Sequence, residues 1–116
     1  MLKNNEQLAQ YFYVAESSIH GRGLFARCRI ARGAYIGTYH GPIVIENGDH
    51  VLWVQDDNDR WIGRDGQNLL RYLNHSKSPD AEFEGFDLFA LREISPDEEI
   101  TIDYGDDILE DVWPDE

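Results

Sequence analysis

The residues best suited to chemistry lie in three short segments that are far apart in the sequence. Residues 19–26 read IHGRGLFA, residues 71–76 read RYLNHS, and residues 98–107 read EEITIDYGDD. Glycine allows a tight turn and the close approach of a ligand to the backbone. Asparagine and histidine offer both hydrogen-bond donors and acceptors, and a buried tyrosine hydroxyl needs a partner. These residue types favour a ligand-binding site.

Each segment also has a purely structural interpretation when it is taken alone. The glycine segment is a possible turn between two strands, and it lacks the glycine spacing and the following helix of a dinucleotide-binding motif. Asn74 is a common residue type at the end of a helix. Tyr104 follows Ile100 and Ile102 at alternate positions, so it is a candidate core residue. The sequence of any one segment does not decide between the two interpretations.

Histidine and cysteine usage predicts no metal site. The four histidines match no zinc-binding spacing, and the single cysteine, Cys28, excludes both an intramolecular disulfide and a site built from several cysteines. Cys28 lies in an alternating stretch at 24–30, which predicts a half-buried thiol on a strand.

The composition bounds the class of protein. A length of 116 residues and a hydrophobic content of 41% predict one globular domain over residues 1–116. Its net charge of −13 disfavours direct binding to nucleic acid and attracts a basic partner. Residues 93–116 hold eleven acidic residues and no Lys or Arg, either for solubility or as a docking surface for a cationic peptide. No apolar run spans a membrane and no signal peptide is evident, which predicts an intracellular protein.

The elements that must position these segments are mostly short strands. Alternating patterns between turn residues predict strands at 11–17, 24–30, 34–45 and 50–55, two more within 81–93, and a last one at 100–105. Residues 46–49, ENGD, predict a hairpin turn. Residues 68–74 predict one or two helical turns, and residues 106–116 a short helix or a flap. The fold class is therefore mostly β with one or two short helices.

The order of the segments resembles a known family. GRGLFA, then GTYHG at 37–41, then RYLNHS and EEITIDYG resemble the SET domain of protein-lysine methyltransferases, over residues 13–105. The small size is similar to that of stand-alone viral and bacterial SET proteins. The resemblance implies short β-sheets with a C-terminal pseudoknot, in which residues 100–105 thread past RYLNHS. Residues 106–116 would form an acidic tail or a lid.

The resemblance also implies roles for individual residues. The implied cofactor is S-adenosylmethionine, which would leave as S-adenosylhomocysteine. Its implied binding residues are Gly21, Arg22, Gly23, Arg71, Asn74, His75 and, as a candidate lid, Trp113. The implied catalytic residues are Tyr104 and Tyr39. The implied walls of the lysine channel are Tyr39, Phe83, Ile102 and Tyr104. No metal is implied. Ile102 stands where the family often has an aromatic residue, and Phe83 leaves room for di- or trimethylation.

The implied chemistry suits these residue types. An aromatic channel would desolvate the substrate ammonium and lower its pKa from about 10.4, so proton loss to water would suffice without a dedicated base. The expected substrate is a basic protein such as a histone or histone-like tail, in the cytoplasm of a bacterium or the nucleus of a eukaryote. The alternative is a catalytically weak SET module that binds a basic peptide. A homodimer is also expected.

Overall fold

The computed structural model describes residues 2–48 and 50–103. Within these residues, ten strands form three small sheets, joined by one short α-helix and one 3-10 helix. The elements are α1 (Asn5–Leu8), β1 (Phe12–Glu16), β2 (Arg22–Ala26), β3 (Tyr35–Thr38), β4 (Ile43–Val44), β5 (Val51–Gln55), β6 (Trp61–Asp65), η1 (Leu69–Tyr72), β7 (Asn74–His75), β8 (Ala81–Glu84), β9 (Asp87–Ala90) and β10 (Glu99–Ile102). None of the helices described is long and apolar enough to cross a membrane.

The first sheet places the last described strand in its interior. The strand order is β1-β2-β10-β7, so β10 lies between β2 and β7, two strands that precede it by many residues. β10 pairs antiparallel with β2 and parallel with β7. Ile100, Thr101 and Ile102 of β10 are all buried, because both faces of this strand are covered. This sheet gathers parts of all three polar segments of the sequence.

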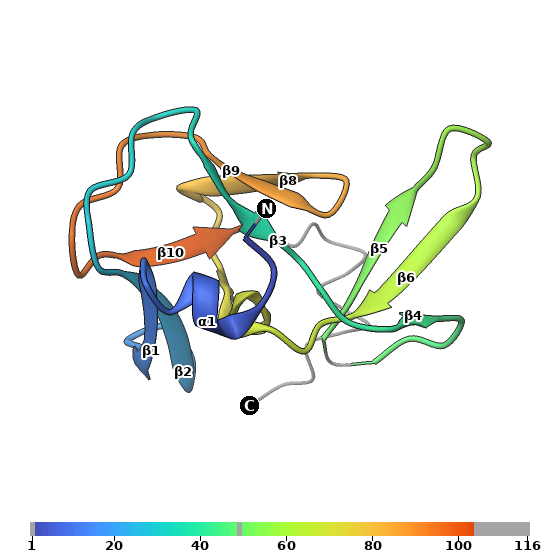
Figure 1. The fold of residues 1–116 in the computed structure, drawn as a ribbon, viewed down its shortest axis with the longest axis horizontal. Coiled ribbons are helices and arrows are strands. Elements are labelled where there is room, and N and C mark those ends of the chain that lie inside the picture. The colour runs from blue at the N-terminus through green and yellow to red at the C-terminus, as the bar shows by residue number, and fades with distance from the viewer. Residues whose placement is uncertain (1, 49, 104–116) are drawn as a thin grey trace.

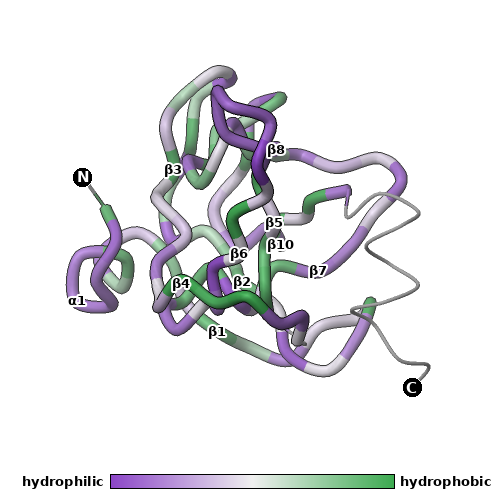
Figure 2. The backbone as a smooth tube through the Cα atoms, turned by 90° about the vertical axis from the view of Figure 1, so that its right-hand side faces the viewer, coloured by the Kyte–Doolittle hydropathy of each residue, from purple (hydrophilic) through white to green (hydrophobic). Residues whose placement is uncertain are grey.

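The other two sheets flank it. One has the order β3-β9-β8, with a register shift between Tyr35 and Gly37. The other has the order β4-β6-β5 and projects away from the β1–β2 hairpin in Figure 1. β4 and the residue after it form a hydrophobic stretch, green in Figure 2, with Ile43 57% and Ile45 94% exposed.

One core joins the first two sheets to the two short helices. Its fully buried large side chains come from both ends and the middle of the described chain, outside the β4-β6-β5 sheet: Leu8, Phe12, Leu24, Ile36, Leu70, Leu88, Ile94 and Ile100. Burying each such side chain contributes about 1.5–3 kcal/mol relative to exposure. α1 is held at its start by Asn4, whose Oδ1 accepts a hydrogen bond from the Gln7 N–H at 2.8 Å. Leu8 thereby points into the core.

The mostly-β prediction is confirmed, and several local predictions are wrong. Residues 46–49 do not join paired strands, because β4 and β5 each pair with β6 and not with each other. β6 and α1 were not predicted. β2 ends at Ala26, so Cys28 lies in the bend after the strand and is exposed, not half-buried on a strand. For residues 46–49 and for β6, strand pairing at a distance overrode the local pattern.

Candidate functional site

The side chain of Asn74 holds the glycine loop in place. Its amide nitrogen lies 3.1 Å from the carbonyl oxygens of both His20 and Arg22 and 2.8 Å from Oε2 of Glu99. Asn74 is only 2% exposed. Its amide protons are therefore used on the protein's own backbone and on one carboxylate. Asn74 fixes the shape of the 20–22 backbone, and direct contact between Asn74 and a cofactor stays a prediction.

Glu99 completes this network from β10. The Ser17 hydroxyl lies 2.8 and 2.9 Å from the two carboxylate oxygens of Glu99, and the same hydroxyl oxygen accepts from the Ile19 N–H at 2.9 Å. A Cβ atom at Gly23 would lie 2.2 Å from Oε2 of Glu99. Gly23 is therefore glycine because the carboxylate occupies the place of a side chain. The segments 17–23, 74 and 99 form one hydrogen-bonded unit.

Gly21 presents an open stretch of backbone beside this unit. Its φ is +42°, and a Cβ atom built there would meet nothing within 4 Å. The Gly21 carbonyl accepts from the Ser17 N–H at 2.8 Å, so the loop is closed on one side and open on the other. Such a loop fits a ligand that lies against the main chain, as the implied S-adenosylmethionine would. Arg22, in contrast, directs an exposed side chain from β2.

A second part of the site is aromatic. The rings of Tyr39 and Phe83 meet edge to face, with centroids 5.7 Å apart. Tyr39 is 6% exposed, and its hydroxyl donates to the His50 carbonyl oxygen at 2.5 Å. Burial and, secondarily, the nearby Asp65 carboxylate raise the pKa of Tyr39 well above its ordinary value. Its hydroxyl is therefore a neutral donor at every physiological pH. Gly66 leaves room for the ring, since a Cβ there would lie 2.2 Å from Cζ of Tyr39.

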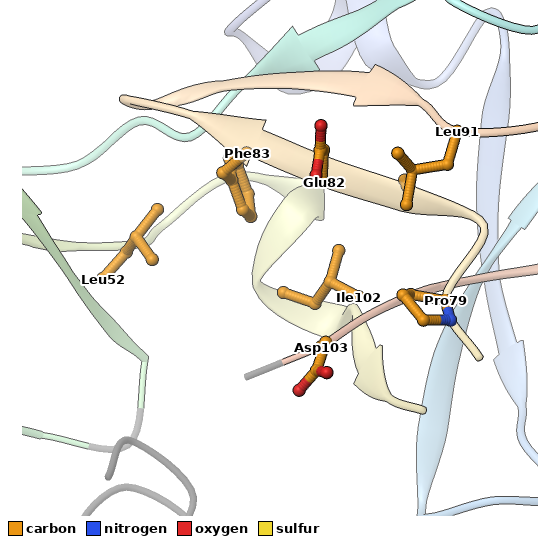
Figure 3. A pocket seen from close by; sticks show the side chains of 8 residues that line it. Leu52, Pro79, Glu82, Phe83, Leu91, Ile102 and Asp103 are labelled. Atoms are coloured by element: carbon orange, nitrogen blue, oxygen red, sulfur yellow. The ribbon is translucent and has the colours of Figure 1, made fainter. Parts of the chain in front are cut away.

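Phe83 and Ile102 line a cavity of about 410 Å³ (Figure 3). The cavity lies between β8 and the end of β10, and Leu52 of β5 closes one side. Its other lining residues are Pro79, Ala81, Glu82, Leu91 and Asp103. Of the expected channel residues, the structure thus brings Tyr39 to Phe83 and Phe83 to Ile102.

The parallel pair β7–β10 connects the loop network to the cavity. Thr101 is opposite Asn74, and Ile102 is opposite His75. Nδ1 of His75 lies 3.7 Å from Oδ1 of Asp103, an ion pair when the imidazole is protonated. Ile102 reaches the cavity, while Asn74 reaches the loop. The polar part of the site, at Asn74 on β7, and the apolar part, at Ile102 on β10, are therefore on neighbouring paired strands.

Asp80 fixes the position of β10. Its Oδ1 accepts from the Thr101 backbone N–H at 2.6 Å and from the Thr101 hydroxyl at 3.2 Å. Asp80 is 1% exposed, and burial raises its pKa above the ordinary value despite these hydrogen bonds. Sequence reasoning assigned Asp80 only to a turn. It also missed Ser17, His50, Gly66 and Glu99, for which local sequence gives no signal.

Of the remaining expected site residues, Arg71 contacts its own helical turn, and two others are not among the residues that the structure describes. The guanidinium of Arg71 lies over the Tyr72 ring, 4.9 Å from its centroid, and donates to the Tyr72 hydroxyl at 2.9 Å. It also donates to the Gln67 carbonyl at 3.3 Å, so Arg71 stabilises η1. Tyr104 and Trp113, together with the 106–116 tail, lie outside the described residues. Among the residues described, no group of three or more His, Cys, Asp or Glu is arranged to hold a metal ion.

Comparison with known proteins identifies the fold. The methyltransferase domain of human histone-lysine N-methyltransferase SETMAR aligns with a TM-score of 0.69 and 23% identity, over 80% of this chain and 44% of that chain. The methyltransferase domain of human PR domain-containing protein 2 aligns with a TM-score of 0.65 and 22% identity, over 84% and 79%. The Chaetomium thermophilum polycomb repressive complex 2 gives 0.70 and 18%, over 82% and 15%. This chain thus spans less than half the length of the SETMAR domain structure.

The fold is that of protein methyltransferase domains. The model of the SET domain matches residues 21–105, most of the chain, and the chain therefore belongs to the SET-domain family. The resemblance drawn from the order of the sequence segments is confirmed. Among curated protein sequences, none matches significantly.

Proposed function

We propose that this protein is an S-adenosylmethionine-dependent protein-lysine methyltransferase that acts on a basic protein such as a histone or histone-like tail. One observation carries the proposal: β7 and β10 pair in parallel, so the loop network of Asn74 and the cavity of Ile102 stand side by side. A transferase needs two adjacent sites, one for each reactant, held in fixed geometry.

The loop network suits the first reactant. Asn74 donates to the carbonyl oxygens of His20 and Arg22 and to the carboxylate of Glu99, and Gly21 leaves its main chain open to a ligand. The cofactor, when bound there, supplies a methyl group on a positively charged sulfur. His75 follows Asn74 on β7 and is the expected neighbour of the adenine ring of the cofactor. Arg22 and Arg71 are assigned on family resemblance, and Arg71 acts through η1.

The aromatic part suits the second reactant. A lysine side chain between Tyr39, Phe83 and Ile102 would lose most of its hydration, which disfavours the charged ammonium and lowers its pKa. After the proton leaves to water, the neutral nitrogen held by these side chains would be the methyl acceptor, and S-adenosylhomocysteine would be the leaving group. The neutral Tyr39 hydroxyl is committed to the His50 carbonyl. Tyr104 is therefore our candidate for orienting the nitrogen.

Calorimetry and mass spectrometry test the proposal together. We expect the protein to bind S-adenosylmethionine and S-adenosylhomocysteine and to add 14-dalton increments to lysines of basic proteins such as histones, as expected for each methyl group. No cofactor binding at millimolar concentration would refute it. Tyr104→Phe should keep cofactor affinity and lose at least about tenfold in kcat, because a positioned donor is removed. Equal turnover by that variant would refute the role of Tyr104.

A catalytically weak module that binds a basic peptide is the second candidate. The charge of −13 and the carboxylates Glu82 and Asp103 at the cavity favour a cationic ligand with or without turnover. Peptide binding without any methyl transfer, in the presence of bound cofactor, would favour this candidate. Homodimer formation and the cellular compartment stay predictions, the first open to sedimentation analysis.

A further inference from the structure

The β4-β6-β5 sheet has a second hollow, on the face opposite the cavity that Figure 3 shows. Leu52 of β5 is opposite Arg64 of β6; Leu52 lines that cavity, and the Arg64 guanidinium lies over the Phe86 ring. Val51 and Asp65, one residue away on the same two strands, are opposite each other and therefore point to the other face. There they line a hollow of about 480 Å³ that shares no lining residue with the cavity.

The rim of this hollow is apolar and exposed. Ile43, Val44 and Ile45 line it along and just after β4, in the green stretch of Figure 2. Ile43 is 57% exposed and Ile45 is 94% exposed. β4 is an edge strand, and within the described residues its outer edge pairs with no other strand. A contiguous apolar patch beside a concave apolar lining is typical of a docking site.

The charge around the hollow indicates which kind of molecule fits. Its carboxylates are those of Glu46 and Asp65, and its other polar side chains are Asn47 and His50. Among the described residues that line it, none is Lys or Arg. The sequence also has no Lys or Arg from 33 to 59, a stretch with five acidic residues. This face of the sheet therefore attracts a cationic partner and repels an anionic one.

Charge disfavours both of the occupants that this chain could itself provide. The C-terminal segment 106–116 has six acidic residues and no Lys or Arg, and a second copy carries a net charge of −13. Each would bring like charge to Glu46 and Asp65.

We propose that Ile43, Ile45 and the hollow beside them dock an amphipathic, basic segment of another protein. An isoleucine- or leucine-sized side chain enters the hollow, and neighbouring Lys or Arg side chains face the carboxylates of Glu46 and Asp65. The docking surface uses no residue of the glycine loop or of the cavity beside Phe83. The inference therefore goes beyond the proposed methyl transfer and does not depend on it.

The probe is a terminally blocked synthetic peptide in which two isoleucines stand between arginines. It contains no lysine, so lysine methylation does not contribute to the signal. Two matched peptides replace the isoleucines by serine or the arginines by uncharged citrulline. We expect the arginine–isoleucine peptide to shift the backbone-amide resonances of residues 43–48, 50–51 and 65. The serine peptide should bind about tenfold more weakly, and the citrulline peptide about two- to fivefold more weakly, as for exposed ion pairs.

Variants of the rim provide matched controls. Ile45→Ser should weaken binding of the peptide about tenfold without loss of stability, because this side chain is 94% exposed in the free protein. Tyr11→Ser removes another large side chain, 40% exposed and remote from β4 in the sequence, and should leave binding unchanged. Glu46→Gln should weaken binding about two- to fivefold, and rising salt should reduce this difference. Glu84→Gln makes the same charge change at an exposed residue outside the hollow and should have no effect.

Three results would overturn the inference. One is equal binding of the peptide to the unmodified protein and to Ile45→Ser, or resonance shifts confined to the cavity beside Phe83 and Ile102. Another is a concentration-dependent dimer in sedimentation that Ile45→Ser abolishes, which would assign this face to a second copy. The third is a shift of the 43–48 resonances by Trp113→Ser without peptide, which would assign it to the chain's own C-terminal segment.

The docking surface and the methyltransferase proposal fail independently. Peptide binding is measured without cofactor, so a protein that does not bind S-adenosylmethionine would refute the proposed function and leave the docking surface supported. Conversely, cofactor binding and lysine methylation by a protein that does not bind the arginine–isoleucine peptide would overturn the docking surface alone.

Discussion

Gly23→Ala tests whether the glycine loop is held by the carboxylate of Glu99. The new Cβ atom would lie 2.2 Å from Oε2 and 2.8 Å from Cδ of Glu99, so the carboxylate must leave its place. Leaving breaks its bonds to the Ser17 hydroxyl and the Asn74 amide. Hydrogen bonds to charged groups contribute about 1.5–3 kcal/mol each when buried.

The net effect follows from two opposing terms. Two such bonds amount to about 3–6 kcal/mol in the buried limit, and we take about half because the pairs are only partly buried. Alanine in a strand is favoured over glycine by about 0.5–1 kcal/mol, which offsets part of the loss. We expect Gly23→Ala to lower the free energy of unfolding by about 0.5–2.5 kcal/mol, measured by urea denaturation with an unchanged slope.

A double-mutant cycle isolates the cause. In a Glu99→Ala background the carboxylate is already absent, and only the Asn74 amide remains within 3.2 Å of the new Cβ. Gly23→Ala should then cost almost nothing, which gives a coupling energy of about 0.5–2.5 kcal/mol. Gly33→Ala serves as control, because Gly33 has φ +83° and open space around it. Its cost should be the same in both backgrounds. The reasoning fails if Gly23→Ala costs the same with and without the Glu99 side chain.

Two further perturbations probe the groups that fix β10 and the aromatic wall. Burial raises the pKa of Asp80, so the folded protein binds the proton of this carboxyl more tightly than the unfolded chain does. Relative to Asp80→Asn, the free energy of unfolding of the unmodified protein should therefore rise as the pH falls from 7 through this raised pKa towards about 3.8. Urea denaturation at each pH measures the difference. A difference independent of pH would contradict this. Tyr39→Phe removes the hydroxyl that donates to the His50 carbonyl. Because the carbonyl loses this partner, the free energy of unfolding, measured by thermal or urea denaturation, should fall by about 1–3 kcal/mol. An unchanged free energy of unfolding would show that water replaces the hydroxyl.

Local pattern was sufficient for elements whose residues alternate and whose partners are adjacent. The two strands predicted within 81–93 are β8 and β9, which join at Gly85 with φ +62°, and the helical turn predicted within 68–74 is η1. β6 was missed because Trp61–Asp65 contains a glycine and two charged residues. It becomes a strand because β4 and β5 pair with its two edges. Sequence position placed 46–49 between two strands, but it could not show that the partner strand came later in the chain.

The site residues also divide into those that the sequence indicated and those that it did not. Motif order pointed to Asn74, Tyr39 and Phe83, and the last two are now seen in contact. Glu99 and Ser17 were invisible because Glu99 gains its role from partners far away along the chain: Ser17 is 82 residues from it and Asn74 is 25 residues from it. Their residue types are common on any acidic surface. No composition or spacing rule distinguishes a carboxylate that replaces a missing side chain from one that faces water.

The parallel pairing of β7 with β10 explains why order along the chain carried more information than any single segment. β7 has two residues, too few for a recognisable strand, and a parallel pair requires a long connection. Here the connection from β7 to β10 contains β8, which carries Phe83 and one wall of the cavity, and its partner β9. The chain therefore forms the apolar wall while returning to pair Ile102 with His75. The polar loop and the cavity are neighbours as a consequence of this single return, so a substitution that weakens the β7–β10 pair should impair both at once.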